Sequence, residues 1–393
     1  MTASTATVAE RIVIVGAGPA GLATARAYRE HGGRGSVTLL GEEPLLPYQR
    51  PPLTKDFLRG QLDAAELPIE RERWFADHDV QLRLGARVSA IEPAAGTVTV
   101  EGGVLESDAI VLATGSEPLR PDLPGMDHAA VMTMRTLADS VRLAKQIRAG
   151  VSVLVLGTGF IGCEIAASLA MLGAKVTLIG QEPLPQAERL GHEAARYIAG
   201  WLEDLDVRLI ANATVRAVHD GRVVELEDGS RLDGACVVLG MGVRPRVELA
   251  ERAGLRVNDG AIPVNSQMGA SCVGRVFAIG DIACAENVSA ARHLRVEHWG
   301  DALGHGEIAG RVLTGEDARW ESVPGFWSTI GIHTLKHAAW GDGYDLARMV
   351  EHPAGGFTVW YSRDGAAVGV LTNDCDTDYE QGRELIRKRE PAP

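Results

Sequence analysis

Short apolar runs alternate with longer segments of mixed polarity over most of the chain, a pattern typical of strands that alternate with helices. Two stretches repeat the order of apolar run, glycine-rich turn, helix-like segment and second apolar run. In each we predict a strand, a helix and a strand, at residues 11–15, 19–31 and 36–40 and at residues 151–156, 160–173 and 175–179. Further strands are predicted at residues 81–91, 97–101, 109–113 and 275–279. The alternation predicts an α/β fold built on parallel sheets.

The last part of the chain has a different character, because aromatic residues concentrate beyond Pro324 in a chain that is 5% aromatic overall. A hairpin is predicted over residues 357–371, since Asp364-Gly365 is a turn signal between two apolar runs. A helix is predicted over residues 379–388. A proline-rich linker is predicted earlier, at Pro118, Pro121 and Pro124. These features predict a third, α+β domain after two α/β units.

Both predicted turns carry the pattern G-x-G-x-x-G, at Gly16, Gly18 and Gly21 and at Gly157, Gly159 and Gly162. Between a strand and a helix, the first glycine permits a tight turn and the second lets the backbone approach a pyrophosphate. The third lets helix and strand pack closely, and the unpaired N–H groups at the helix start face the anion. Two such motifs predict two dinucleotides in one chain and electron transfer between them.

An acidic residue about 20 positions beyond the last glycine is expected to bind the adenosine ribose. Glu42 lies 21 positions beyond the first motif and fits this role for FAD; a solvated loop acid is the alternative. In the second motif the strand ends at Gly180, Gln181 and Glu182 follow, and no arginine or lysine precedes Arg189. A 2′-phosphate would need such a cation, so the segment favours NADH over NADPH.

The composition narrows the class of protein. A length of 393 residues allows two or three domains, and 46% hydrophobic with 23% charged residues is typical of a globular protein. The net charge of −13 argues against nucleic acid as a partner. No apolar run approaches the ~18 residues of a membrane span, and the N-terminal segment lacks the features of a signal peptide. The five cysteines are widely spread and never form C-x-x-C, which favours reduced thiols in the cytoplasm.

Residues 46–55 form a segment that is predicted to be rigid. Pro51 and Pro52 favour an extended path, and Thr54 is a suitable N-cap for a short helix after it. Lys55 is then predicted near a helix N-terminus, an unfavourable place for a cation. On these residues alone, the segment is a rigid loop with one solvated lysine.

Six motifs follow one another along the chain, at residues 16–21, 50–55, 113–115, 157–164, 280–281 and 295–299. Together they resemble the FAD-dependent NAD(P)H:ferredoxin reductases, a family that includes the reductases of putidaredoxin, rubredoxin and aromatic-ring dioxygenases. The run Arg-Pro-Pro-Leu-Thr-Lys at residues 50–55 is much more specific than the glycine patterns. The resemblance implies a glutathione-reductase-like architecture with two Rossmann-type domains: FAD-binding residues 1–118 and 245–320, NAD(P)H-binding residues 119–244, and a C-terminal α+β domain of residues 321–393.

The resemblance also implies roles for individual residues. Lys55 would face flavin N5 and pair with Glu164, because a cation held there stabilises electron density that arrives on the flavin. Asp281 would bind the ribitol hydroxyls, with a helix cap as the alternative. A helix that opens at His298 and Trp299 would direct its positive end at the flavin pyrimidine. The remaining implied dinucleotide contacts are Pro19, Ala20, Arg50, Val88, Ala113, Thr114, Gly115, Arg135, Phe160, Ile161, Gly242 and Gly280.

Trp327 resembles the aromatic residue beside the flavin at which electrons are thought to leave for the partner. The resemblance therefore implies hydride transfer from NADH, or NADPH, to FAD, then single-electron transfer to a ferredoxin of the 2Fe–2S or another type. That ferredoxin would supply a cytochrome P450 or a ring-hydroxylating oxygenase. The catalytic residues would be Lys55, Glu164 and Trp327, with no metal ion. The chain departs from the family pattern at residues 329–331 and 371–378, which leaves partner docking open.

Two other functions fit the same scaffold: a reductase of small acceptors such as quinones, radicals or oxygen, and an NADH-sensing flavoprotein. Thiol chemistry is not expected, because residues 44–58 contain no cysteine and Cys163 suits a packed position. We expect a cytoplasmic monomer or homodimer without nucleic-acid or membrane partners.

Three side-chain clusters have two interpretations each. His333 and His337 are more simply a structural pair than metal ligands. Three aspartates suit the start of the closing helix better than a calcium loop, namely Asp374, Asp376 and Asp378. Five bases form either a patch that steers an acidic ferredoxin or scattered solvated charges, namely Arg292, His293, Arg295, Lys336 and His337.

Overall fold

The computed structural model describes residues 9–270, 274–353 and 355–393. The chain divides into two compact units, each assembled from three segments. The first contains residues 1–49, 68–116 and 245–326, and the second contains residues 50–67, 117–244 and 327–393. The short strands β8 (Ser116–Pro118) and β17 (Val243–Pro245) lie where the chain passes from one unit to the other. The finer division into FAD, NAD(P)H and C-terminal domains stays a prediction.

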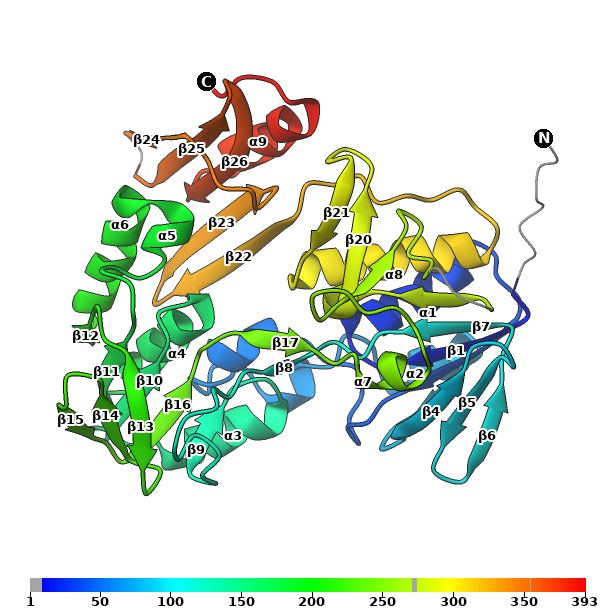
Figure 1. The fold of residues 1–393 in the computed structure, drawn as a ribbon, viewed down its shortest axis with the longest axis horizontal. Helices are drawn as coiled ribbons and strands as arrows, with labels where there is room; N and C mark the ends of the chain where they lie inside the picture. Colours follow the sequence, from blue (N-terminus) through cyan, green and yellow to red (C-terminus); the bar gives the residue numbers. More distant parts are fainter. Residues whose placement is uncertain (1–8, 271–273, 354) are drawn as a thin grey trace. The chain divides into compact units, whose positions relative to one another are not determined.

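The first unit is built on a five-stranded parallel sheet in the order β19-β7-β1-β2-β3. Its strands are β1 (Arg11–Val15), β2 (Ser36–Leu40), β3 (Val80–Arg83), β7 (Ala109–Leu112) and β19 (Val276–Ala278). Helix α1 (Pro19–Glu30) follows β1 and packs along α8 (Trp299–Leu313), as Figure 1 shows. Pro19 suits the first helical position because its fixed φ is already helical. The strand–helix–strand order predicted over residues 11–40 is confirmed.

Smaller elements complete the first unit. One antiparallel sheet contains β4 (Val88–Glu92), β5 (Thr97–Val100) and β6 (Gly103–Glu106), and another sheet contains β18 (Ile262–Val264), β20 (Ala283–Asn287) and β21 (Arg292–Arg295). The short helices are α2 (Glu72–Asp77), α7 (Glu248–Arg252) and η3 (Gly280–Ile282). The single strand predicted at residues 81–91 is wrong. A turn at Gly85, whose φ of +65° favours glycine, separates β3 from β4, and the two strands belong to different sheets.

The second unit contains its own five-stranded parallel sheet, in the order β12-β11-β10-β16-β9. The strands are β9 (Val131–Thr133), β10 (Ser152–Leu156), β11 (Lys175–Ile179), β12 (Arg208–Ile210) and β16 (Cys236–Leu239). The helices are α3 (Leu137–Gln146), α4 (Phe160–Met171), α5 (Ala187–Leu190) and α6 (His192–Glu203). An antiparallel sheet of β13 (Val215–His219), β14 (Val223–Leu226) and β15 (Arg231–Asp233) contributes Val218 and Val224 to a core shared with Leu154 and Leu156 of β10. The order of β10, α4 and β11 confirms the second predicted strand–helix–strand unit.

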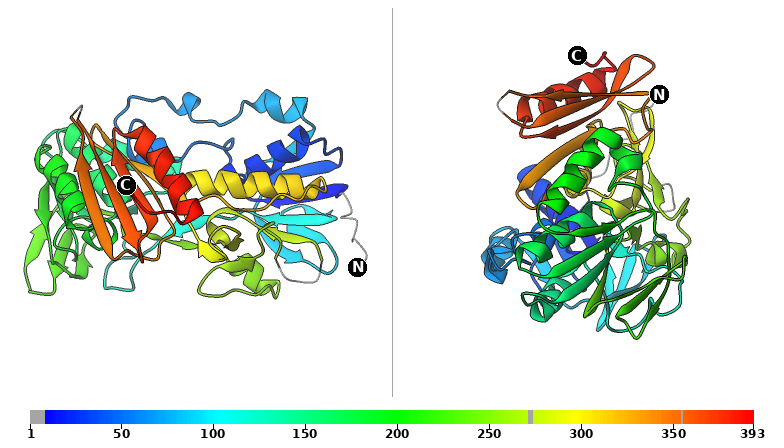
Figure 2. Two further views of the ribbon diagram at one scale, coloured as in Figure 1. Left: turned by 90° about the horizontal axis from the view of Figure 1, so that it is seen from above. Right: turned by 90° about the vertical axis from the view of Figure 1, so that its left-hand side faces the viewer.

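The second unit also contains a five-stranded sheet in the order β22-β23-β26-β25-β24. Its strands are β22 (Gly325–Ile330), β23 (His333–Ala339), β24 (Leu346–Glu351), β25 (Phe357–Arg363) and β26 (Ala366–Asn373). The predicted hairpin is confirmed, because β25 and β26 pair antiparallel around Asp364 and Gly365, both at positive φ. Helix α9 (Asp376–Lys388) packs on β26 and β23 and lies across one face of the sheet in Figure 2. It begins three residues earlier than predicted, where acidic residues favour a helix N-terminus.

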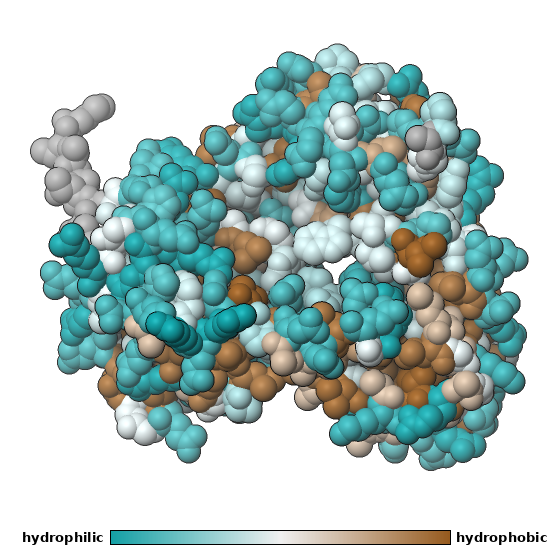
Figure 3. Space-filling view, turned by 180° about the vertical axis from the view of Figure 1, so that it is seen from behind, coloured by the Kyte–Doolittle hydropathy of each residue, from teal (hydrophilic) through white to brown (hydrophobic). Residues whose placement is uncertain are grey.

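Hydrophilic residues predominate on the face drawn in Figure 3, and apolar residues form separate patches among them. The large apolar side chains that are most exposed are Val104, Ile332 and Leu346. In the part of the chain that the structure describes, no helix is both long and apolar enough to cross a membrane.

Candidate active site

The first glycine turn is closed at its ends and open in its middle. Gly16 has φ of +118°, and a Cβ there would lie 2.1 Å from the carbonyl oxygen of Ala113. A Cβ at Gly21 would lie 2.0 Å from the carbonyl oxygen of Gly16. At Gly18, in contrast, a Cβ would meet no atom within 4 Å. The turn therefore leaves free space beside its middle glycine, at the N-terminus of α1, where a pyrophosphate would fit.

The second glycine turn repeats this geometry. A Cβ at Gly157 would lie 2.4 Å from the carbonyl oxygen of Gly240, and one at Gly162 would lie 1.9 Å from the carbonyl oxygen of Gly157. A Cβ at Gly159 would meet its nearest atom at 3.7 Å, which is an ordinary van der Waals contact. Phe160 and Ile161 are the first residues of α4 behind this turn. Each unit therefore contains one turn that can receive a dinucleotide.

Glu42 follows β2, as predicted for the acid that binds the adenosine ribose. Arg246 Nη1 donates a hydrogen bond to Glu42 Oε2 at 2.8 Å, and Arg87 Nε lies 3.5 Å from Glu42 Oε1. The backbone of Arg246 is itself fixed, because its N–H donates to Gly115 O at 2.8 Å and its carbonyl accepts from Thr114 Oγ1 at 2.7 Å. This arginine thus connects Glu42 to two other predicted FAD contacts. Sequence reasoning missed it, because 204 positions separate the pair and no local spacing signals it.

The segment around Lys55 differs from the sequence-based prediction. The 3-10 helix η1 (Pro51–Thr54) ends immediately before Lys55, so the expected helix after Thr54 is wrong. Pro51 and Pro52 fix φ at the first helical positions, which starts the helix before Thr54 instead. Lys55 therefore follows a helix C-terminus, a favourable place for a cation, and its Nζ donates to Pro51 O at 3.0 Å. A second short helix, η2 (Ala64–Glu66), lies later in the same segment.

The structure brings Lys55 and Glu164 together as a buried ion pair, with 2.6 Å between Lys55 Nζ and Glu164 Oε2. The two side chains are only 11% and 3% exposed. Glu164 is the only charged residue in α4, which is otherwise apolar or small. A charge at such a position must be paired, because an unpaired buried carboxylate is strongly unfavourable.

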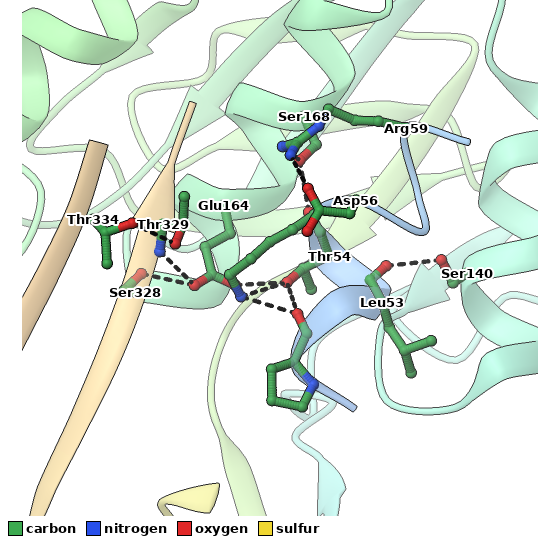
Figure 4. A network of polar contacts seen from close by, with 12 residues as sticks. Leu53, Thr54, Asp56, Arg59, Ser140, Glu164, Ser168, Ser328, Thr329 and Thr334 are labelled. Atoms are coloured by element: carbon green, nitrogen blue, oxygen red, sulfur yellow. Dashed lines mark hydrogen bonds and ion pairs between the residues drawn. The ribbon is translucent and has the colours of Figure 1, made fainter. Parts of the chain in front are cut away.

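Three further donors converge on the Glu164 carboxylate. Thr54 Oγ1 donates to Oε2 at 2.6 Å. Ser328 Oγ donates to Oε1 at 2.7 Å, and the backbone N–H of Thr329 approaches the same oxygen at 3.3 Å. Figure 4 shows Glu164 between Thr54 on η1 and the β22 residues Ser328 and Thr329. Sequence reasoning found the pair through the family resemblance but did not find the hydroxyl groups around it.

The remaining predicted residues occupy defined positions. Arg50 Nη1 donates to the carbonyl oxygen of Arg135 at 2.7 Å, so two predicted cofactor contacts touch each other. Asp281 is buried in the first turn of η3, whose N-cap is Ile279, so it is not the N-cap residue of that helix. Val88 begins strand β4, and Ala113 directly follows strand β7. His298 is the N-cap of α8, and Trp299 is its first residue. Gly242 and Gly280 both have positive φ.

Trp327 and Ser328 are neighbours on β22 with opposite environments. The Trp327 side chain is exposed, at 42%, whereas Ser328 is 1% exposed. Successive side chains on a strand point to opposite faces, which explains the difference.

The histidine and aspartate clusters have structural partners. His333 and His337 lie on strand β23 rather than on a helix, and their rings pack against Trp201 and Tyr361. Asp376 pairs with Lys336, and Asp378 accepts a hydrogen bond from Thr358. Arg295 pairs with Glu297, so at least two of the candidate bases of the predicted patch, Arg295 and Lys336, have carboxylate partners. Within the described ranges, no group of three or more potential ligands could hold a metal ion.

Cys163 lies in α4 and is fully buried. Burial raises the pKa of its thiol far above the ordinary value, and Sγ lies 3.5 Å from the carbonyl oxygen of Thr158. This cysteine is therefore a packing residue, as the sequence indicated, since the reactive species would be the thiolate.

A family model described as pyridine nucleotide-disulphide oxidoreductase matches residues 10–306. This match spans both glycine turns and most of both units. The chain belongs to this family. It is accordingly an oxidoreductase that uses FAD and NAD(P)H.

Named relatives extend the match to nearly the whole chain. The chain is 31% identical over 386 residues to ferredoxin–NAD(P)+ reductase of Sphingomonas sp., which covers 96% of this chain and 93% of the relative. It is 33% identical over 388 residues to rhodocoxin reductase of Rhodococcus erythropolis, covering 97% and 90%. A chain of the covalent putidaredoxin reductase–putidaredoxin complex matches with a TM-score of 0.92 and 28% identity over 98% of this chain and 94% of that chain. The predicted resemblance and the glutathione-reductase-like fold class are confirmed.

Proposed function

We propose that this protein is an NADH-dependent ferredoxin reductase that takes hydride onto FAD and passes single electrons to a ferredoxin. The observation that carries the proposal is the pair of glycine turns, each open at its middle glycine. The relative named as a ferredoxin–NAD(P)+ reductase supports the acceptor. Bound FAD would supply the conversion of a two-electron hydride into single electrons.

We assign FAD to the first turn and NAD(P)H to the second. The space beside Gly18 and the N–H groups of α1 would hold the FAD pyrophosphate, and Glu42, oriented by Arg246, would accept the ribose hydroxyls. Lys55, held by Glu164, would place a positive charge at the flavin N5 position, where electron density arrives. Each residue thus binds or orients a dinucleotide, and none has to act as a nucleophile.

The preference for NADH rests on the end of β11. Glu182 is the acid that follows this strand, and its Oε2 accepts the backbone N–H of Glu188 at 3.0 Å. A carboxylate at this position accepts the ribose hydroxyls of NADH and repels the 2′-phosphate of NADPH. The nearest following cation, Arg189, is exposed on α5. We therefore propose NADH as the preferred donor.

The finer properties of the partner are also proposals. We propose a ferredoxin of the 2Fe–2S or another type that supplies a cytochrome P450 or a ring-hydroxylating oxygenase, and a reductase that is a monomer or homodimer. The cytoplasm is the proposed compartment, supported by four described cysteines that are free and widely spaced along the chain.

Two matched valine substitutions test the proposal. Gly18 and Gly159 both have negative φ and open space, so valine can be accommodated in the protein but would occupy the place of a pyrophosphate. Gly18→Val is expected to give folded, colourless protein that retains no FAD. Gly159→Val is expected to give yellow protein that dithionite still reduces, whereas NADH reduces it at least ~100-fold more slowly than the wild type. The measurements are flavin absorbance and anaerobic stopped-flow reduction, with circular dichroism as the control for folding.

The wild-type protein, mixed with NADH and NADPH in the same instrument, should be reduced at least ~10-fold faster by NADH. Bound FAD in folded Gly18→Val, or normal reduction of Gly159→Val by NADH, would contradict the assignment of the two turns. Rapid turnover with a quinone and none with any ferredoxin would instead support a reductase of small acceptors.

A further inference from the structure

The Glu164 carboxylate is held asymmetrically. Oε2 accepts Lys55 Nζ and Thr54 Oγ1, both at 2.6 Å, whereas Oε1 accepts Ser328 Oγ at 2.7 Å and lies 3.3 Å from the Thr329 N–H. Removal of the Ser328 hydroxyl would leave Oε1 with only this long contact. The carboxylate could then rotate, and the oxygen that faces the lysine would shift. The hydroxyl groups therefore fix the orientation of the carboxylate and, with it, the place of the oxygen that faces the ammonium group.

The position of the ammonium group depends in turn on that oxygen. Lys55 Nζ has three acceptors within reach: Glu164 Oε2 at 2.6 Å, Pro51 O at 3.0 Å and Thr54 Oγ1 at 3.3 Å. The shortest contact, and the only one with an ionised partner, is to Glu164. A change in the orientation of the carboxylate would therefore move the charge of Lys55.

The scaffold around the pair does not depend on these hydroxyl groups. Backbone carbonyls of η1 are fixed from two helices, since Ser140 Oγ of α3 donates to Leu53 O and Ser168 Oγ of α4 donates to Thr54 O, both at 2.7 Å. The segment that carries Lys55 would stay in place if the hydroxyl of Thr54 or Ser328 were removed. Their contribution is therefore separable from the fold.

We propose that Ser328 and Thr54 are positioning residues that hold Glu164 so that the Lys55 ammonium is fixed for hydride transfer. Ser328 makes this contact from β22, directly after the exposed Trp327, so one strand carries both the predicted site of electron exit and the support of the ion pair. The inference rests on the proposed role of Lys55 beside the flavin. It gives a role to Ser328, and it gives Thr54 a role other than the helix cap that the sequence suggested.

The test compares Ser328→Ala with two reference variants in FAD-loaded protein. Lys55→Met removes the charge itself. Thr334→Val is the control, because it removes a hydroxyl group on β23 that forms a hydrogen bond with Thr329 Oγ1 at 2.9 Å and not with Glu164. Ser328→Ala is expected to slow the limiting rate of flavin reduction by NADH about 3- to 10-fold, as for loss of one hydrogen bond to a charged group. The NADH concentration at half-saturation should stay unchanged. The flavin midpoint potential should fall in the same direction as in Lys55→Met, and Thr334→Val should change neither quantity.

A double-mutant cycle separates positioning from a general structural effect. If Ser328 acts through Lys55, Ser328→Ala should cause no further change in rate or potential in a Lys55→Met background. Thr54→Val should reproduce the effect of Ser328→Ala, and Thr54→Ser, which keeps the hydroxyl, should restore the wild-type values. This second pair of variants keeps the test decisive if Ser328→Ala does not fold.

The two possible failures are distinguishable. If Lys55→Met leaves both rate and potential unchanged, the proposed role of Lys55 is wrong and the inference falls with it. If Lys55→Met changes them but Ser328→Ala and Thr54→Val do not, only the positioning role is overturned. A full effect of Ser328→Ala in the Lys55→Met background would likewise overturn it.

Discussion

At the scale of single residues, His305 shows how burial changes the chemistry of one side chain. It lies in α8 with no exposed surface, its ring meets Trp320 edge-on at 4.6 Å, and neither ring nitrogen has a hydrogen-bond partner among the residues described. Burial lowers the pKa of His305 from 6.5 to about 4, and the nearby carboxylates of Asp301 and Asp281 only partly oppose this. The ring is therefore neutral in the folded protein at pH values where it is already protonated in the unfolded chain.

This difference predicts a loss of stability in acid. Between pH 6.5 and about 4 the unfolded chain binds the extra proton, so the free energy of unfolding falls as the pH falls through this window, by up to about 3 kcal/mol from this group. His305→Leu, which cannot titrate, should lack this part of the pH dependence. The measurement is urea denaturation of both proteins from pH 8 to pH 4 at saturating FAD. Curves that stay parallel over that range would contradict the prediction.

At the scale of elements, the contact between α1 and α8 depends on small residues. A Cβ at Gly306 would lie 2.3 Å from the carbonyl oxygen of Ala20, and one at Gly310 would lie 2.6 Å from the carbonyl oxygen of Thr24. Only glycine lets the two helix backbones approach so closely. Both helices begin at predicted FAD contacts, Pro19 and Trp299, so their spacing also sets the shape of that site.

Two alanine substitutions on α8 should therefore have opposite effects. Gly306→Ala is expected to destabilise the protein by about 3 kcal/mol and to weaken FAD retention, because its Cβ would force the helices apart. The Cβ that Gly304→Ala adds would meet no atom within 4 Å. This substitution should stabilise the protein by about 0.5–1 kcal/mol, because alanine favours the helix. Chemical denaturation and the dissociation constant for FAD measure both effects. Equal stability of the two variants would show that the helix contact is not tight.

At the scale of the whole molecule, the proposed entry of electrons and their predicted exit are assigned to different residues of the chain. The hydride would enter through the dinucleotides bound at the two glycine turns. The exit is predicted at Trp327, whose side chain is 42% exposed on β22. The residues that follow, 329–331, depart from the family pattern, so the exit is where this chain is expected to differ most from its relatives.

Trp327→Ala should affect only the second half of the reaction. We expect electron transfer to a ferredoxin to fall about 10-fold or more, while anaerobic reduction of the flavin by NADH stays within about 2-fold of the wild type. Ile332→Ala is the matched control, because Ile332 is 81% exposed in the turn that follows β22. Ferredoxin-coupled reduction of cytochrome c and stopped-flow reduction of the flavin measure the two halves. Equal losses in both halves for Trp327→Ala would mean that the ring is only structural.

Local sequence was sufficient to predict the two strand–turn–helix–strand units and their glycines, because tight turns and buried strands depend on residues a few positions apart. The family motifs were also sufficient to pair Lys55 with Glu164. Only the structure showed that Arg246 holds Glu42, that Ser328 holds Glu164, and that a short helix ends at Thr54 instead of starting after it. Arg246 and Glu42 are 204 positions apart in the sequence, and Ser328 and Glu164 are 164 positions apart. A local sequence pattern cannot predict contacts over such separations. Glu164 needs its partners because it is buried, and only the folded chain brings Ser328 to it, whereas Arg246 and Glu42 form an exposed pair that the fold brings together.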